Sequence, residues 1–318
     1  MFECSNHRES DRKFVVRDEG DIAGYFHRFE AFRTDGSLDP GRTIDVFLPR
    51  NYDRIDRRYP VLYLNDGQTA FFKPSIGEQS LDMAHTLGAL YERRLIRELI
   101  VVAIYPVNRA REYTHANWSG PDCCGVESYT GYVAETIKPF IDRSYRTLPE
   151  PGTTMIAGSS HGGLAAFYIA SRRPDAFGYA GALSPSFWVG VDDAERFPLI
   201  KPLPDRLLKD SQLLAAVKET LAAALRRPKL YLDWGLVRTG GLHNESIEER
   251  AAARGREMVK LLEQEYAYET GKDLIVYEDP DGEHNEQSWA RHMPRVLEFF
   301  VKNRGQDMLS CPEIAGSL

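Results

Sequence analysis

Continuous apolar runs that alternate with helical patterns constrain the fold of this chain most strongly. YPVLYLNDG (59–67) and LIVVAIYP (99–106) are uninterrupted in the way typical of strands covered on both faces. Further β-rich runs stand at 25–34, 42–51, 153–158, 179–185, 229–235 and 273–280, and helical patterns fill 81–97, 128–142, 162–173, 246–267 and 287–303. This alternation predicts an α/β fold with a mostly parallel sheet of roughly eight strands and helices on both faces.

The same pattern predicts one large domain over residues 25–303, between an N-terminal extension (1–24) and a C-terminal tail (304–318). Residues 186–226 interrupt the alternation and form an insertion. Because it follows a strand, the insertion would lie at the carboxyl side of the sheet, where ligands bind in open α/β folds. It is a candidate lid or pocket wall, and a packing helix is the alternative.

Net charge, apolar run length and cysteine usage limit the partners and the cellular compartment that we expect for this chain. The net charge of −7 over 318 residues argues against nucleic-acid phosphates and anionic membranes. No apolar stretch is long enough to span a bilayer, and the charged start MFECSNHRESDRKF lacks the apolar centre of a secretory signal. The four cysteines form no C-x-x-C pair, which is typical of reduced thiols. We therefore expect a cytoplasmic protein.

The segment GSSHG (158–162) matches the pattern G-x-S-x-G, with Ser160 in the middle. A serine on a tight turn between strand and helix adopts strained backbone angles, and side chains two positions away would collide with both elements. Glycine removes that collision. A β-rich run ends at the first glycine and a helical pattern follows, so the context favours Ser160 as a nucleophile over a serine in an ordinary turn.

A serine hydroxyl needs a base within hydrogen-bond reach. In sheets of this type the residues follow the chain order Ser, acid, His, which leaves His243, His284 and His292. His284 stands in a loop just past the last predicted strand and is the favoured base. His292 falls inside the final helical pattern, and His243 follows TGG in an irregular loop.

The acid should lie between the strand KLYLDWG (229–235) and His284. Four carboxylates qualify by position: Asp233, Glu245, Glu248 and Glu249. Spacing alone leaves them nearly equal, because most acidic residues in such a stretch are solvated charges or helix caps. Neither H-E-x-x-H nor a paired C-x-x-C motif occurs, so no metal is predicted.

Three stretches resemble one family of esterases among the α/β-hydrolases, which includes enterochelin esterases, feruloyl esterases, S-formylglutathione hydrolases and mycolyl transferases. They are YPVLYLNDGQTAFF (59–72), the block from FIDRSYRTLPEPG to SPSFW (140–188), and DGEHNEQSWARHMP (281–294). The resemblance covers residues 25–303 and implies an α/β-hydrolase fold.

Carried over by position, the resemblance makes Ser160 the nucleophile and His284 the base. The backbone N–H groups of Gln68 and His161 would form the oxyanion hole. The chain departs from the family after the seventh strand, where many members read Gly-Thr-x-Glu and this sequence has GLVR (235–238). Matching ARGREMVKLL to the family's next helix favours Glu248 as the acid.

The resemblance implies a carboxylic ester hydrolase that works through an acyl-serine and needs no cofactor. Its partner would be a small-molecule ester. An acyltransferase with the same triad, and a non-catalytic binding protein on a hydrolase scaffold, are the alternatives. Candidate substrate contacts are Asp66, Phe71, Trp188 and Trp289, and Arg109 and Arg111 are either solvated or hold an acidic group.

Overall fold

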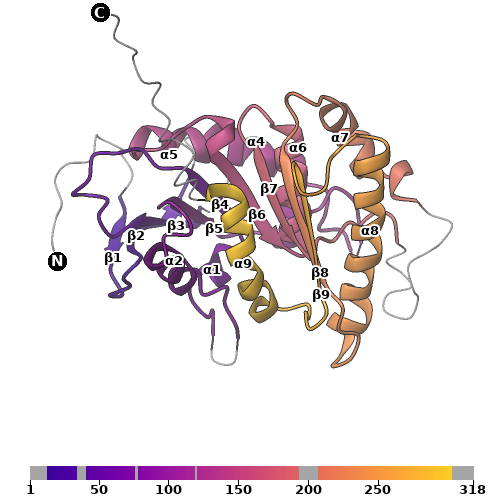
Figure 1. Ribbon diagram of the computed structural model, residues 1–318, viewed down its shortest axis with the longest axis horizontal. Coiled ribbons are helices and arrows are strands. Elements are labelled where there is room, and N and C mark those ends of the chain that lie inside the picture. Colours follow the sequence, from indigo (N-terminus) through magenta and orange to yellow (C-terminus); the bar gives the residue numbers. More distant parts are fainter. Residues whose placement is uncertain (1–12, 34–40, 76–77, 119, 193–206, 303–318) are drawn as a thin grey trace, which may run out of the picture.

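One sheet runs through the molecule and carries helices on both faces (Figure 1). The computed structural model describes residues 13–33, 41–75, 78–118, 120–192 and 207–302. Within them, nine strands pair in the order β1-β2-β3-β5-β4-β6-β7-β8-β9. The strands are β1 (Val15–Arg17), β2 (Gly24–Phe32), β3 (Arg42–Pro49), β4 (Val61–Asn65), β5 (Ile100–Ile104), β6 (Thr154–Ser159), β7 (Tyr179–Leu183), β8 (Lys229–Gly235) and β9 (Leu274–Asp279).

The strands from β4 to β9 pair in parallel, whereas β1, β2 and β3 pair antiparallel and β3 joins β5 antiparallel. This topology confirms the predicted α/β fold with a mostly parallel sheet. Each predicted β-rich run forms a strand. The additional strand, β1, has three residues at the sheet edge, too few to leave a period-two pattern, and it lies within residues 1–24.

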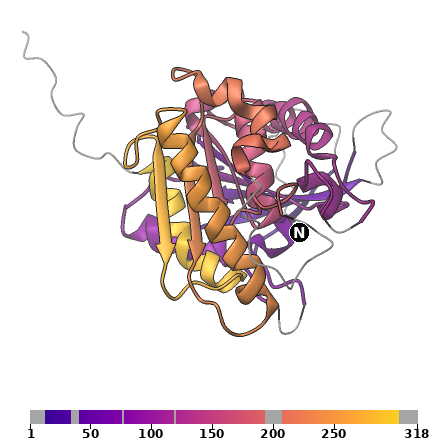
Figure 2. The ribbon, with the colours of Figure 1, turned by 90° about the vertical axis from the view of Figure 1, so that its right-hand side faces the viewer.

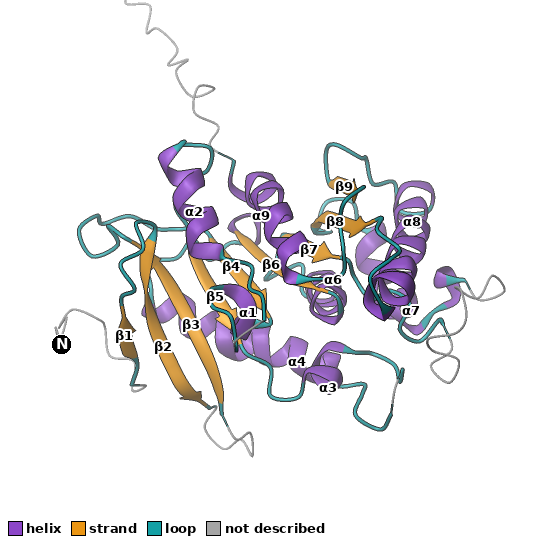
Figure 3. Ribbon diagram, turned by 90° about the horizontal axis from the view of Figure 1, so that it is seen from below, coloured by secondary structure: helices purple, strands orange, loops and turns teal. Residues whose placement is uncertain are grey.

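The two faces of the sheet pack against different helices because side chains alternate along each strand. In β4, Leu62 and Leu64 join the core that contains α2 and α9, whereas Val61 and Tyr63 join the core under α6. Figure 3 shows α2 and α9 on one side of the sheet and α4 and α6 on the other. The helices are α1 (Gly67–Ala70), α2 (Met83–Glu92), α3 (Arg109–Tyr113), α4 (Val126–Gly131), α5 (Lys138–Ser144), α6 (His161–Arg172), α7 (Gln212–Ala222), α8 (Glu249–Gln264) and α9 (Glu286–Val301).

Shorter helical turns connect these elements: the π-helices η1 (Tyr132–Ile137) and η5 (His243–Glu248), and the 3₁₀ turns η2 (Pro151–Thr153) and η4 (Leu208–Asp210). The π-helix η5 runs directly into α8, which lies beside the sheet end that carries β8 and β9 (Figure 2). A π turn is wider than an α turn and is frequent at functional sites. It brings the start of α8 to the carboxyl ends of these strands.

Within the described part of the predicted insertion, α7 forms a packing helix. Leu213, Val217 and Leu221 of α7 are buried in the core beneath α6, and Arg172 of α6 donates a hydrogen bond to the carbonyl of Ala216. Residues 193–206 of the candidate lid lie outside the described residues, as does the C-terminal tail predicted from residue 304.

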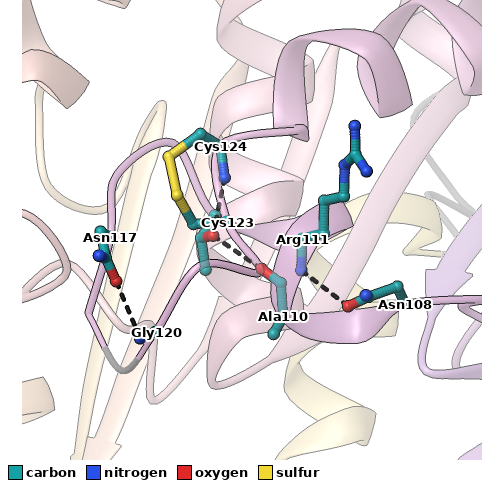
Figure 4. Close-up of a disulfide and its surroundings, with 8 residues drawn as sticks. Asn108, Ala110, Arg111, Asn117, Gly120, Cys123 and Cys124 are labelled. Carbon is teal, nitrogen blue, oxygen red and sulfur yellow. Dashed lines mark hydrogen bonds between the residues drawn. A yellow bond between two sulfur atoms is a disulfide. The ribbon is translucent and has the colours of Figure 1, made fainter.

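The expectation of reduced thiols is wrong for the adjacent pair Cys123 and Cys124, which form a disulfide in the loop after α3 (Figure 4). Neighbouring residues bring their sulfur atoms together without folding a long loop. The backbone N–H of Cys124 donates to the Thr114 hydroxyl at 3.4 Å, and Asn117 accepts from the N–H of Gly120 at 3.0 Å. These hydrogen bonds tie the disulfide to its loop.

Candidate active site

The parallel strands bring their carboxyl ends to one edge of the sheet, and Ser160 stands there between β6 and α6. Its backbone has φ 55° and ψ −121°, a conformation that is strained for any residue other than glycine. Two main-chain hydrogen bonds hold the turn: the N–H of Ser160 donates to the Leu183 carbonyl at 2.8 Å, and its carbonyl accepts from Ser186 at 3.1 Å. The strained turn expected from the GSSHG pattern is therefore present.

Steric crowding requires glycine at positions 158 and 162, on either side of the serine. A Cβ atom at Gly158 would lie 2.5 Å from the Gly162 carbonyl oxygen, and one at Gly162 would lie 2.7 Å from a carboxylate oxygen of Asp66. Neither the helix backbone nor the buried carboxylate can move away cheaply. The strand and helix can approach this closely only without side chains at these two positions.

His284 lies in the loop between β9 and α9 with its ring against the serine. Its Nε2 is 3.0 Å from Ser160 Oγ. The backbone N–H of His284 donates to the side-chain carbonyl of Asn244 at 2.9 Å, and Asn244 in turn donates to the carbonyl of Thr239 at 2.8 Å. The π-helix η5 thus holds the loop that carries the imidazole.

Glu248 contacts the other ring nitrogen of His284. Its Oε2 is hydrogen-bonded to Nδ1, while its Oε1 accepts from the Ser184 hydroxyl at 2.9 Å and from the backbone N–H of Gly235. The side chain of Glu248 is fully buried. Trp289 donates its indole N–H to the same Ser184 hydroxyl at 3.0 Å. The carboxylate is therefore fixed from three sides.

Two of the remaining acid candidates point elsewhere. Glu245 is exposed, and Asp233 contacts a different histidine, His292, at 3.0 Å. His292 also contacts Asp279 at 2.8 Å through its second nitrogen. Burial raises the pKa of Asp233, whereas the pKa of His292 lies above its usual value because its two carboxylate partners outweigh the effect of burial.

A pocket of about 310 Å³ opens above Ser160. Of the predicted substrate contacts, Asp66 and Trp289 line it. Phe71 is instead buried and packs in the core against Phe47, with ring centroids 5.1 Å apart. Trp188 is also buried and packs against the ring of His161. The full lining is Asp66, Gln68, Thr69, Arg109, Trp118, Ser159, Ser160, His161, His243, Ile247, His284, Glu286 and Trp289.

Arg109 reaches the pocket, whereas Arg111 does not line it. The guanidinium of Arg109 holds Asp66 with two hydrogen bonds of 2.7 and 2.9 Å and also donates to the Ser159 carbonyl at 3.4 Å. Sequence reasoning missed this ion pair, because Asp66 follows β4 whereas Arg109 begins α3, 43 residues further along the chain. It neutralises the charge of Asp66 within the pocket.

Two backbone N–H groups at the pocket stand in the first turns of helices. His161 is the first residue of α6 and Gln68 the second of α1. The first N–H groups of a helix have no acceptor within that helix. Both residues line the pocket beside Ser160.

A family model described as "Putative esterase" matches residues 36–300. The chain belongs to this family. It is 25% identical over 155 residues to protein YbbA of Bacillus subtilis (strain 168), a match that covers 46% of this chain and 58% of YbbA. It is 29% identical over 151 residues to an endo-1,4-beta-xylanase/feruloyl esterase of Xylanibacter ruminicola, covering 45% of this chain and 19% of that enzyme.

Among solved structures, an S-formylglutathione hydrolase from Agrobacterium tumefaciens aligns with a TM-score of 0.60 and 16% identity over 90% of this chain and 98% of that one. At this level of identity the match shows a shared fold. The chain spans about half the length of YbbA. Among the described residues, none of the helices is both long and apolar enough to cross a membrane.

Proposed function

We propose that the protein is a serine carboxylesterase in which Ser160, His284 and Glu248 form the catalytic triad. The observation that carries this proposal is the 3.0 Å contact between Ser160 Oγ and His284 Nε2, with Nδ1 of the same ring bound to Glu248. Glu248 accepts a hydrogen bond from the Nδ1–H of His284, which leaves Nε2 without a proton and able to accept the proton of the serine.

In the acylation step, Ser160 Oγ attacks the ester carbonyl and its proton passes to His284 Nε2. The leaving alcohol then takes this proton as the carbon–oxygen bond breaks. In the second step, His284 takes a proton from water, which attacks the acyl-serine, and returns it to Ser160 as the acid departs. Glu248 stabilises the imidazolium that forms in both steps.

The backbone N–H groups of His161 and Gln68 would hold the negative oxygen of each tetrahedral intermediate. Their place in the first helical turns supports this role, since the positive ends of α6 and α1 favour developing negative charge. A single donor of this kind contributes about 2.7–4 kcal/mol to transition-state stabilisation in known hydrolases.

The pocket supports a small-molecule ester as substrate. Its volume of about 310 Å³ is at the lower end of the range for small-molecule sites. Trp118, Ile247 and Trp289 offer apolar contacts, and the Arg109–Asp66 pair offers a polar one at the same mouth.

A fluorophosphonate probe combined with ester turnover tests the proposal. We expect the wild-type protein to be labelled and Ser160→Ala to be unlabelled, with hydrolysis of p-nitrophenyl acetate lowered by at least about 10³-fold. Ser159→Ala is the matched control, because it removes the adjacent hydroxyl and should still be labelled. Equal labelling of wild type and Ser160→Ala would exclude the proposed nucleophile.

A further inference from the structure

Ser186, in the loop after β7, lies behind the proposed nucleophile. Its Oγ is 3.4 Å from Ser160 Oγ and 3.1 Å from Nδ1 of His161. The side chain is fully buried and does not line the substrate pocket. Its backbone N–H donates to the Ser160 carbonyl at 3.1 Å, so the two serines are held together by the main chain.

The position of each proton follows from the partners. In the proposed mechanism Ser160 donates its hydroxyl proton to His284, so its oxygen can only accept from Ser186. Burial, with the charges of Arg109 and His284, lowers the pKa of His161 to about 3, and its ring is neutral near pH 7. Within the described part of the chain, Nε2 of His161 is buried without a hydrogen-bond partner.

A neutral imidazole carries one N–H, on either nitrogen. A proton on Nε2 of His161 would be a buried donor without an acceptor, whereas a proton on Nδ1 is donated to Ser186 Oγ. The second arrangement leaves the Ser186 hydroxyl proton free to point at Ser160. Each donor in the series His161, Ser186, Ser160 then has one acceptor.

We propose that Ser186 is a further catalytic residue, which donates a hydrogen bond to Ser160 Oγ when that oxygen becomes the leaving group of the acyl-enzyme. This inference rests on the proposed function. During deacylation the bond between the acyl carbon and Oγ breaks, its electron pair remains on Oγ, and His284 supplies the proton. A donor at Oγ stabilises the charge that accumulates before the proton arrives.

The resting distance fits a contact that acts late in the reaction. At 3.4 Å it is longer than the 2.7–2.8 Å usual for hydroxyl pairs, so the interaction is weak while Oγ is neutral. Negative charge on the acceptor shortens and strengthens such a bond. In acylation Oγ acts as the nucleophile, and a hydrogen bond donated by Ser186 would reduce its nucleophilicity. This loss opposes the stabilisation of negative charge on Oγ, so the net benefit of the donor falls on deacylation.

Burst kinetics with p-nitrophenyl acetate separate the two steps, because nitrophenol release reports acylation and the steady state reports deacylation. We expect Ser186→Ala to slow deacylation about tenfold and to change acylation less than about threefold. Ser171→Ala, which removes a buried hydroxyl of α6 that does not line the pocket, should change neither. A merely structural role for Ser186 would slow both steps alike.

Fluorophosphonate labelling of Ser186→Ala at the wild-type extent confirms that the site is intact. If this variant does not fold, His161→Phe provides the test, because it removes the Nδ1 donor and keeps an aromatic ring between Trp118 and Trp188. It should slow deacylation in the same direction by a smaller factor. An active wild type with unchanged deacylation in the folded variant would overturn this inference alone, whereas an inactive, unlabelled wild type would overturn the proposed function.

Discussion

His284 and His292 stand in the same stretch of chain after β9, are both buried, and differ in what faces their second nitrogen. Nδ1 of each ring contacts a carboxylate, Glu248 for His284 and Asp233 for His292. Nε2 of His284 faces the hydroxyl of Ser160, whereas Nε2 of His292 faces a second carboxylate, Asp279.

We infer from this difference that only His284 is placed to act as a base, because only its second nitrogen faces a proton donor. A hydroxyl can donate to an unprotonated nitrogen, so the position of His284 Nε2 suits it to accept the proton of Ser160. Two carboxylates favour a ring that carries a proton on both nitrogens. His292 therefore links the ends of β8 and β9, whereas His284 is positioned for the proton transfer that we propose.

Replacing each histidine by glutamine gives the largest test of this comparison. We expect His284→Gln to lower ester turnover by at least about 10³-fold, because Ser160 loses its base. His292→Gln should retain activity within about tenfold, since its ring contacts no member of the proposed triad. Turnover of p-nitrophenyl acetate is measured at a temperature where circular dichroism shows both variants folded. Equal losses in the two variants would remove the distinction.

The carboxylates provide the second test, with Glu248→Gln matched by Asp233→Asn. Oε1 of Glu248 accepts from Ser184 and Gly235, so the glutamine carbonyl should occupy that position and its NH₂ should face Nδ1 of His284. The ring proton then moves to Nε2, and the base is lost.

We expect Glu248→Gln to lower kcat about 10²–10³-fold, with a smaller change in KM. Asp233→Asn should change kcat less than about tenfold. A larger loss in Asp233→Asn than in Glu248→Gln would assign the acid to the other cluster.

The elements that depend on local sequence could be predicted, and those set by tertiary packing could not. The continuous apolar runs predicted the central strands, and the glycines of GSSHG predicted the strained turn at Ser160, because both demands act over a few residues. The four acid candidates could not be separated by spacing. Glu248 reaches His284 through the wide turn of η5, which no residue pattern signals.

Ser184 and Ser186 were missed for a related reason. They lie in SPSFW, a stretch that contributed to the family resemblance but has no charged or basic group to suggest chemistry. Their contacts with Glu248 and Ser160 depend on how the loop after β7 crosses the carboxyl edge of the sheet. Hydroxyl groups in such loops become interpretable only once their partners are known.

Asp279→Asn provides the last and smallest test, because it makes the surroundings of His292 resemble those of His284. The pKa of His292 lies above its usual value while both carboxylates face the ring, so removing one should lower it. The stabilisation from the His292 imidazolium is fully present below pH of about 6.5 and is lost as the pH rises through the folded-state pKa. In Asp279→Asn this loss should therefore occur at lower pH. NMR titration of the ring, assigned by the signal missing from His292→Gln, gives the midpoint directly, and a midpoint unchanged by Asp279→Asn would show that the second carboxylate does not hold the proton.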